Sequence, residues 1–298
     1  MRVRVGRRTI DISNPDKVLF PHAGYTKSDV VEYYRRVAPT LLPYVRGRPV
    51  TLHRYPDGIE AAGFYQKEAA DYFPQWICKQ RVAKEGGSLS MVIVNDAATL
   101  VYLAGQAMIT PHVWLSRIDQ RKRPDRMIID LDPSNGEFEA VRQTARWVRT
   151  RLEELGLVSF VMTTGSSGLH VVVPLRRTVP FEFVRQFARR VADGLAEEHP
   201  TVLTTEQRKA KRRGRVYLDT LRNAYAQTAV APYALRARHD GPVATPLAWD
   251  ELDQHDMSPT RYTLRTMLER LDRIGDPWQG MGRRARSIAA AQRKLGDR

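Results

Sequence analysis

The sequence has a single cysteine and no long apolar run. Cys78 alone cannot form an intramolecular disulfide or a zinc site of several thiolates, so both are excluded. The most apolar stretch, residues 91–109, is broken by Asn95, Asp96 and Gln106 and falls short of a membrane span. The N-terminal residues lack the apolar segment of a signal peptide. We therefore expect a soluble, cytoplasmic protein without a membrane partner.

Acidic residues are few relative to basic ones. The chain has 48 lysines and arginines against 33 aspartates and glutamates, so its formal net charge is +15. A general bias toward arginine would also raise the charge, but here the basic residues gather at positions 117–126, 208–215 and 283–298. Clustered positive charge is typical of proteins that bind a polyanion, because each neutralised phosphate releases counterions. We expect association with nucleic acid, and hence with the nucleoid.

The first third of the chain alternates short strands and helices. Thr26 and Asp29 have the spacing of a capping box, which predicts a helix that Pro39 and Pro43 end. No repeat or flexible linker interrupts this part of the sequence. The same reasoning predicts strands at residues 49–54 and 91–94, a turn at 57–58, and a helix capped by Asp96 that runs to about residue 108.

The second part of the chain predicts an α+β fold in the order strand, helix, hairpin, helix, strand. This order resembles a ferredoxin-like or RNA-recognition-motif (RRM) core, with the helices on one face of the sheet. The corresponding residues are 127–132, 138–155, 159–173, 183–195 and 216–219. The last forty residues have a helical pattern, with Tyr262, Leu264, Met267, Leu268 and Leu271 as candidate packing positions.

Three aspartates end predicted strands. Asp130 and Asp132 are two residues apart, so both side chains leave the same face of a strand. Two adjacent carboxylates repel each other, and a Mg²⁺ or Mn²⁺ ion would relieve that repulsion, although an Asp-Pro pair often only ends a strand. Asp219 ends another apolar strand and adds a third carboxylate. Three convergent carboxylates suit two-metal phosphoryl transfer.

Other residues have the chemistry of phosphate binding. The glycines between Thr164 and His170 would let backbone N–H groups approach an anion, although an ordinary glycine hairpin has the same pattern. A Walker A motif is absent. His112 fits a core histidine as well as a ligand. Arg236 and Arg238 alternate on a predicted strand and would grip a triphosphate or line a solvated edge.

Taken in order, these motifs resemble the polymerase domain of bacterial DNA ligase D, in the archaeo-eukaryotic primase superfamily. Each motif is weak alone, but the ordered set is specific and covers nearly the whole chain. The matching segments are Asn14–Pro21, Gly24–Lys27, Arg54–Gly58, Phe64–Lys67, Asp130–Pro133, Gly168–Leu175, Leu218–Asp219, Leu221–Asn223, Gln227–Tyr233 and Leu235–Arg238.

The resemblance implies a fold and an activity. We expect one primase-polymerase domain over residues 1–298, with an RRM-like catalytic module at about 111–298 packed against an N-terminal α/β module at about 1–110. The implied activity is template-dependent nucleotidyl transfer that fills short gaps or break ends, in non-homologous end joining or excision repair, with ribonucleotides often preferred. The implied cofactors are two Mn²⁺ or Mg²⁺ ions. The implied partners are NTPs or dNTPs, gapped or broken DNA with a 5′-phosphate, a Ku-like end-binding protein and a separate DNA ligase.

The resemblance also assigns roles to residues. Asp130, Asp132 and Asp219 would hold the metals and form the catalytic centre. The incoming nucleotide would contact His112, Thr164, Ser166, His170 and Arg236. The template would contact Phe64, Arg54, Lys67, Arg212 and Arg213. A 5′-phosphate would bind Asn14, Lys17 and Lys27, where we also expect free N–H groups of the helix start to favour an anion.

The sequence departs from the family pattern at three places and leaves other functions open. Ser167 and His53 stand where lysine is frequent, and Thr110-Pro111-His112 replaces a more usual Glu-x-His, which leaves the partner of His112 undefined. The alternatives are a primase that starts chains de novo, a metal-dependent nuclease, or a non-enzymatic single-strand binder. The sequence ends soon after the last motif, so we expect either a stand-alone enzyme or an excised domain.

Overall fold

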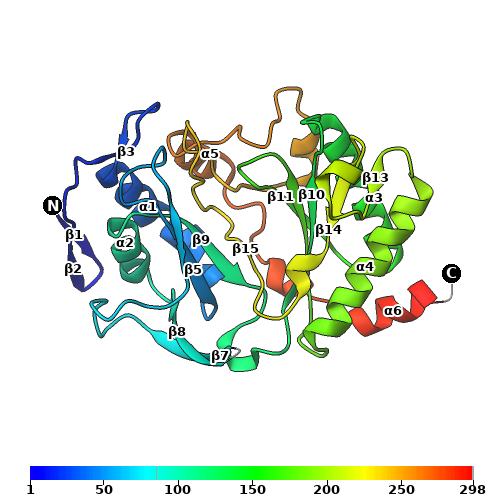
Figure 1. The fold of residues 1–298 in the computed structure, drawn as a ribbon, viewed down its shortest axis with the longest axis horizontal. Coiled ribbons are helices and arrows are strands. Elements are labelled where there is room, and N and C mark those ends of the chain that lie inside the picture. The colour runs from blue at the N-terminus through cyan, green and yellow to red at the C-terminus, as the bar shows by residue number, and fades with distance from the viewer. Residues whose placement is uncertain (85, 297–298) are drawn as a thin grey trace. The chain divides into compact units, whose positions relative to one another are not determined.

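The chain folds into two compact units, each assembled from separate segments of sequence. The structure, a computed structural model, describes residues 1–84 and 86–296 (Figure 1). Unit 1 comprises Met1–Asp119, Thr228–Ala244 and Tyr262–Gly275, and unit 2 comprises Gln120–Gln227, Thr245–Arg261 and Asp276–Arg298. The boundary that we predict near residue 110 falls within β9 (Met108–Trp114), a strand of unit 1.

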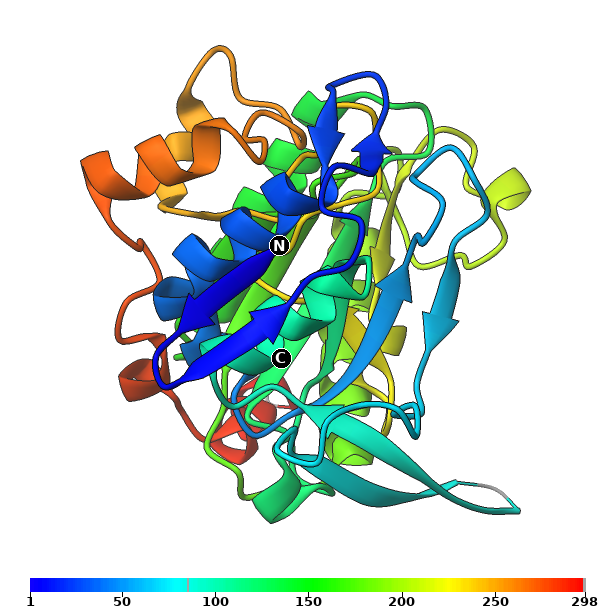
Figure 2. The same ribbon diagram turned by 90° about the vertical axis from the view of Figure 1, so that its left-hand side faces the viewer.

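Unit 1 is built on a sheet with the strand order β15-β9-β5-β8-β7, in which β6 pairs with β5. The strands β7 and β8 form a long hairpin (Figure 2). Two small hairpins, β1–β2 and β3–β4, precede the sheet. The elements of unit 1 are β1 (Arg2–Val5), β2 (Arg8–Asp11), β3 (Val18–Phe20), β4 (Tyr25–Thr26), α1 (Lys27–Val45), β5 (Pro49–Arg54), β6 (Phe64–Gln66), β7 (Lys79–Lys84), β8 (Gly87–Ile93), α2 (Ala97–Gly105), β9, β15 (Thr228–Val230) and α5 (Thr266–Ile274).

Helix α1 confirms the predicted start but not the predicted end. Thr26 caps it and forms the capping box with Asp29. The helix continues through Pro39 and Pro43 to Val45, so the prediction that the prolines end it is wrong. Both prolines lie on the exposed face, where the carbonyls that lose an N–H partner can bond water. The opposite face buries tyrosines and aliphatic residues, and this burial stabilises the helix in spite of the missing hydrogen bonds.

Unit 2 contains the predicted RRM-like core. Its sheet has the order β13-β14-β10-β12-β11-β16, and helices α3 and α4 pack on the sheet (Figure 1). The four strands β14-β10-β12-β11 are mutually antiparallel neighbours, as expected for strand-helix-hairpin-helix-strand connectivity. The elements are η1 (Ile118–Gln120, at the junction of the units), β10 (Arg126–Asp132), α3 (Phe138–Glu154), β11 (Phe160–Thr163), β12 (Leu169–Pro174), α4 (Phe181–Glu198), β13 (Leu203–Thr204), η2 (Lys209–Lys211), β14 (Val216–Asp219), η3 (Leu221–Asn223), β16 (Pro246–Leu247), η4 (Trp249–Asp253), η5 (Met281–Arg284) and α6 (Ile288–Gly296).

Three predictions of secondary structure differ from the structure. The helix capped by Asp96 ends at Gly105, because the chain turns there and enters β9. Of the last forty residues, those that the structure describes are helical in α5, in the 3-10 helix η5 and in α6, and irregular between them, while residues 297–298 lie outside the described residues. Arg236 and Arg238 lie in an irregular loop and not on a strand. In that loop, the Arg238 N–H donates to the Arg236 carbonyl, so the backbone bends too tightly to be extended.

Candidate active site

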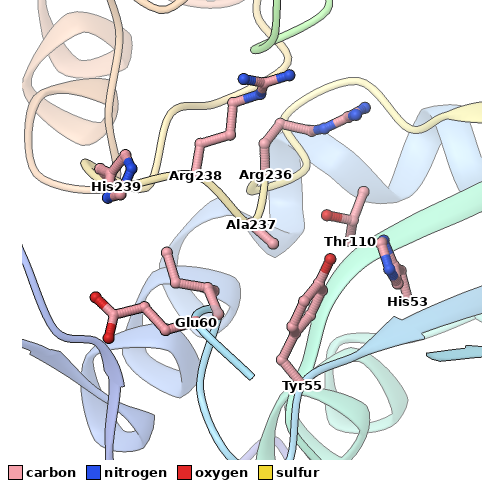
Figure 3. A pocket seen from close by; sticks show the side chains of 9 residues that line it. His53, Tyr55, Glu60, Thr110, Arg236, Ala237, Arg238 and His239 are labelled. Atoms are coloured by element: carbon pink, nitrogen blue, oxygen red, sulfur yellow. The ribbon is translucent and has the colours of Figure 1, made fainter. Parts of the chain in front are cut away.

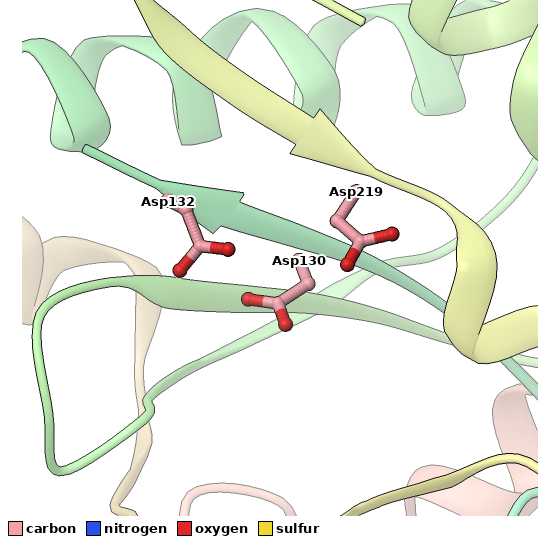
Figure 4. A group of neighbouring side chains, drawn as sticks. All are labelled: Asp130, Asp132 and Asp219. Atoms are coloured by element: carbon pink, nitrogen blue, oxygen red, sulfur yellow. The ribbon is translucent and has the colours of Figure 1, made fainter. Parts of the chain in front are cut away.

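The three aspartates predicted as metal ligands meet at one place in the sheet of unit 2. Asp130 and Asp132 project from β10, and Asp219 ends the neighbouring strand β14 (Figure 4). The antiparallel register sets Asp130 directly opposite Asp219. One carboxylate oxygen from each aspartate lies within 4.8 Å of the others, a spacing that suits a bound cation.

Burial and neighbouring negative charges raise the pKa of two of these carboxyls. Burial, and then the negative charges of Asp130 and Asp219, raise the pKa of Asp132 from 3.8 to about 6. Burial also raises the pKa of Asp219, against the effect of the Leu221 N–H, which donates to Asp219 Oδ1 at 2.7 Å. Such mutual repulsion is what a divalent cation neutralises.

Asp130 is the most buried of the three, with 4% of its surface exposed. Burial acts to raise its pKa, but His170 and then Arg222 outweigh burial, so the pKa of Asp130 lies below its ordinary value. His170 Nε2 lies 3.4 Å from Asp130 Oδ1, and Arg222 Nε lies 3.5 Å from Asp130 Oδ2. Asp130 Oδ1 is nevertheless buried without a hydrogen-bond partner. A buried ionised oxygen in this state fits a metal ligand.

Arg222 and Asn223 support the site, and the sequence analysis assigned a role to neither. Asn223 is fully buried and bonds both backbone groups of one residue of β10: its Oδ1 accepts from the Ile128 N–H at 2.9 Å, and its Nδ2 donates to the Ile128 carbonyl at 2.7 Å. This pair of bonds fixes β10 two residues before Asp130. The segment Leu221–Asn223, which begins two residues after the third aspartate, was the available signal.

The glycine hairpin 164–170 packs directly against β10. A Cβ on Gly168 would lie 2.1 Å from the Leu131 carbonyl oxygen, so only glycine fits there. Gly165 has a φ of +64°, which glycine adopts without strain. The Thr164 hydroxyl and N–H bond within the turn to Gly168, and Ser167 is exposed at its tip. The hairpin therefore holds His170, on β12, opposite Asp130, on β10. Ser166 is half-buried in the turn.

In unit 1, the predicted nucleotide ligands His112 and Arg236 lie near a polar cavity. Arg236 lines this cavity, which has a volume of about 380 Å³ (Figure 3). Burial of His53 in the same wall, and then the positive charge of Arg236, lower the pKa of His53. The His53 ring stacks on Tyr65 with centroids 4.0 Å apart, and His112 lies 6.3 Å from His53. The lining residues are His53, Tyr55, Ile59, Glu60, Thr110, Arg236, Ala237, Arg238 and His239. Thr110 donates its hydroxyl to the Leu235 carbonyl at 2.6 Å, and Tyr65 meets His112 edge-on.

The predicted 5′-phosphate residues gather at the start of α1. The loop before the helix folds back, so that the Lys27 ammonium donates to the Ser13 carbonyl at 2.8 Å. Burial, and then the positive charges of Lys17 and Arg54, lower the pKa of Lys27. Lys17 Nζ lies 2.7 Å from Asp57 Oδ1. Asn14, at the turn of the loop, is exposed and has a φ of +46°.

The expectation of free N–H groups at this helix start is wrong. The Lys27 N–H donates to the Lys17 carbonyl, and the Ser28 N–H donates to the Pro15 carbonyl. The Asp29 N–H donates to the Thr26 hydroxyl. These bonds form because the loop folds back over the first turn, so an anion here would depend on side chains.

Most residues predicted to contact a template are exposed. Phe64 is 46% exposed on β6, and the Arg54 guanidinium lies 5.5 Å from its ring centre. Lys67 is exposed immediately after β6. In unit 2, the Arg212 guanidinium stacks at 3.9 Å on the ring of Tyr217, the residue opposite Asp132, while Arg213 is exposed with a φ of +51°.

Within residues 1–84 and 86–296, no helix is both long enough and apolar enough to span a bilayer.

Comparisons with known proteins converge on one family. The family described as "LigD, primase-polymerase domain" matches residues 26–278. The "Multifunctional non-homologous end joining protein LigD" of Mycolicibacterium smegmatis is 35% identical over 270 residues, which cover 90% of this chain and 35% of that protein. The "Bifunctional non-homologous end joining protein LigD" of Bacillus subtilis is 32% identical over 271 residues, 90% of this chain and 43% of that protein. The chain thus spans less than half the length of these relatives.

A solved structure is similar over almost its whole length. It is the "Polymerase Domain from Mycobacterium tuberculosis Ligase D in complex with DNA", with a TM-score of 0.88 and 34% sequence identity. The similarity covers 93% of this chain and 99% of that one.

Proposed function

Because this chain belongs to the LigD primase-polymerase domain family, and is thus a nucleotidyltransferase, we propose that it copies a template to fill short gaps or break ends in DNA. The observation that carries the proposal is the carboxylate cluster of Asp130, Asp132 and Asp219, at the end of an RRM-like sheet. Asp130 has a buried oxygen that accepts no hydrogen bond, and Asp132 has a raised pKa, and both properties fit ligands of divalent metal ions.

We propose that Asp130, Asp132 and Asp219 hold two ions, Mn²⁺ or Mg²⁺. When bound, such ions supply charge stabilisation to the attacking and leaving oxygens of phosphoryl transfer. The chain's own groups orient the ligands: His170 and Arg222 flank Asp130, and the Leu221 N–H directs one oxygen of Asp219. Asp132 must lose its proton before it can bind a cation.

We also propose substrate roles for the other predicted residues. The incoming NTP or dNTP would contact five of them, of which Arg236 offers a bidentate fork for phosphate oxygens. Phe64 would stack on a template base and Arg54, Lys67, Arg212 and Arg213 would hold template phosphates. The cations at the start of α1 would hold a 5′-phosphate. The nucleotide ligands are His112, Thr164, Ser166, His170 and Arg236.

The pathway is proposed from the names of the relatives. Non-homologous end joining would bring a Ku-like end-binding protein and a DNA ligase as partners, whereas excision repair would require only the gap and a ligase. Ribonucleotide preference is part of the same proposal.

Extension of a labelled primer on gapped DNA tests the function, with each NTP and dNTP supplied singly in Mn²⁺ or Mg²⁺. We expect the unmodified protein to add the nucleotide that the template dictates. Asp130→Ala and Asp219→Ala should each abolish this addition. The affinity for gapped DNA should stay nearly unchanged in both variants, because phosphate contacts elsewhere dominate affinity. Shortening of the primer would indicate a nuclease, and products without a primer would indicate a primase. Substantial extension by either variant would refute the metal assignment.

A further inference from the structure

We propose that unit 2 has a second nucleic-acid surface, at the end of its sheet opposite to the carboxylate cluster, which takes the phosphate backbone of duplex DNA. It consists of eight basic residues from three distant segments, and we term it the strand-end basic surface. Its residues are Arg121, Lys122, Arg123, Arg176, Arg177, Arg283, Arg284 and Arg286.

Backbone hydrogen bonds bring the three segments together. Arg126 pairs with Pro174 at the first residue of β10, and the Leu175 N–H donates to the Asp125 carbonyl at 2.9 Å. The Arg176 N–H donates to the Arg286 carbonyl at 2.9 Å. The chain before β10, the chain after β12 and the chain after η5 are therefore neighbours. Two of the basic clusters noted in the sequence, which the proposed polymerase roles do not use, thus contribute to one surface.

The charge of this surface is almost entirely positive. Segments 120–126, 174–178 and 283–287 contain one acid, Asp125. Asp125 forms an ion pair at 3.8 Å with Arg126, whose side chain is only 4% exposed. This acid is therefore paired with a buried arginine that is not one of the eight residues of the surface. Six of the eight basic residues are exposed, and Arg121 and Arg177 are half-buried. Glu182, at the start of α4, lies 3.8 Å from Arg185 of the same helix.

The surface is separate from the carboxylate cluster. Asp130 follows Arg126 on β10 by four residue steps, which corresponds to about 13 Å at about 3.3 Å per residue. The basic segments lie beyond Arg126, at the start of the strand, whereas the carboxylates lie at its end. A nucleotide bound at the carboxylates therefore does not occupy the strand-end basic surface.

Arginine accounts for seven of the eight residues, which favours phosphate over carboxylate polymers as the partner. The guanidinium fork bonds two phosphate oxygens at once, and an evenly spaced phosphate backbone can meet several arginines in succession. The surface needs no base recognition, so it would bind duplex DNA without sequence preference. This proposal does not require the chain to be a polymerase.

The test is the affinity of the full chain for an ungapped duplex of about 24 base pairs, measured by fluorescence anisotropy over a salt series. The variant combines Arg176→Ala, Arg283→Ala and Arg284→Ala, three exposed residues from two segments. We expect roughly tenfold weaker binding at low salt, and a slope of log affinity against log salt that is smaller by about two to three, near 0.9 per lost phosphate contact. Primer extension at saturating gapped DNA should remain within about twofold.

A matched control removes the same charge elsewhere. Arg4→Ala, Arg7→Ala and Arg273→Ala replace three exposed arginines of unit 1, and this triple variant should keep most of the duplex affinity and slope. A lysine variant that combines Arg176→Lys, Arg283→Lys and Arg284→Lys keeps the charge and should keep the slope, which separates phosphate binding from a folding defect.

Three outcomes would overturn the proposal: unchanged duplex binding by the first variant, an equal loss in the control, or a loss of slope in the lysine variant. If the first variant loses binding to poly-glutamate but keeps its duplex affinity, the surface takes an acidic protein and the proposal also fails. Absence of primer extension by the unmodified protein, together with intact duplex binding, would count against the proposed polymerase and not against this surface.

Discussion

Replacing Asp132 by asparagine should stabilise the metal-free protein at neutral pH, although it removes a proposed metal ligand. In the fold, burial and two neighbouring aspartates raise the pKa of Asp132 from 3.8 to about 6. The folded state therefore binds this proton more tightly than the unfolded state does. Stability is lost as the pH rises from 3.8 through 6, and the full cost is present above pH 6.

The magnitude follows from the size of the shift. A rise from 3.8 to about 6 corresponds to about 3 kcal/mol, at 1.36 kcal/mol per pKa unit. Asp132 is half-buried, so solvent screening reduces this to about 1–2 kcal/mol. Asparagine has nearly the same shape and no charge, and should recover that amount.

Urea unfolding in EDTA, followed by tryptophan fluorescence at pH 7.5 and pH 4.0, measures the effect. We expect Asp132→Asn to unfold at higher urea than the unmodified protein at pH 7.5, and the difference to shrink at pH 4.0. Added Mn²⁺ should stabilise the unmodified protein more than the variant, because the variant has lost a ligand. Asp250→Asn, at an exposed position of unit 2, is the control and should change little.

Two results would refute this reasoning. The first is a variant that is no more stable than the unmodified protein at pH 7.5 in EDTA. The second is a gain of equal size at both pH values, which would mean that packing and not charge is responsible.

Three further experiments have expected outcomes. In competition binding with gapped DNA, Lys17→Ala should remove most of the preference for a 5′-phosphate over a 5′-hydroxyl. Asp57→Ala frees Lys17 from a 2.7 Å ion pair and should strengthen that preference roughly two- to fivefold. Equal binding of both ends by the unmodified protein would contradict this prediction. Ser167→Lys should lower KM for nucleotides in steady-state extension, by at most about 1.5–3 kcal/mol of binding, and a raised KM would show that no phosphate lies near the hairpin tip. Gly168→Ala should destabilise the protein by about 1–3 kcal/mol in urea, because its Cβ would meet the Leu131 carbonyl at 2.1 Å, while Ser167→Ala at the exposed neighbour should not.

Local patterns predicted the local structure well. The capping box at Thr26, the Asp-x-Asp strand end and the glycine hairpin depend on residues close in sequence, and each is confirmed. Helix α1 shows where this reasoning fails, because the rule that proline ends a helix considers only the lost hydrogen bond. Whether Pro39 faces solvent or the core depends on what packs against the helix, which no local pattern contains.

The three aspartates of the candidate site were predictable from the sequence, but their arrangement and supporting residues were not. Asp130 and Asp219 are distant in sequence, and only the register of β10 with β14 sets them opposite each other. The contacts of Arg222 and Asn223 depend on the same register, because their side chains reach back to β10 from the turn after β14. The loop over the start of α1 was unpredictable for the same reason: its backbone partners lie outside the helix.

The discontinuous make-up of unit 1 bears on how the chain is synthesised. The Tyr33 hydroxyl donates to the Tyr233 carbonyl, and the Tyr34 hydroxyl accepts from the Leu235 N–H, across about 200 residues. At about 5–20 residues per second, a ribosome needs roughly 5–20 s to pass from residue 119 to residue 228. During that interval the nascent N-terminal segment lacks β15, the carbonyl that accepts from Tyr33 and the N–H that donates to Tyr34, so the outer edge of β9 has no strand partner. Since unit 1 needs residues up to 275, and unit 2 uses residues on both sides of that point, neither unit can complete its fold before residue 275 has been synthesised.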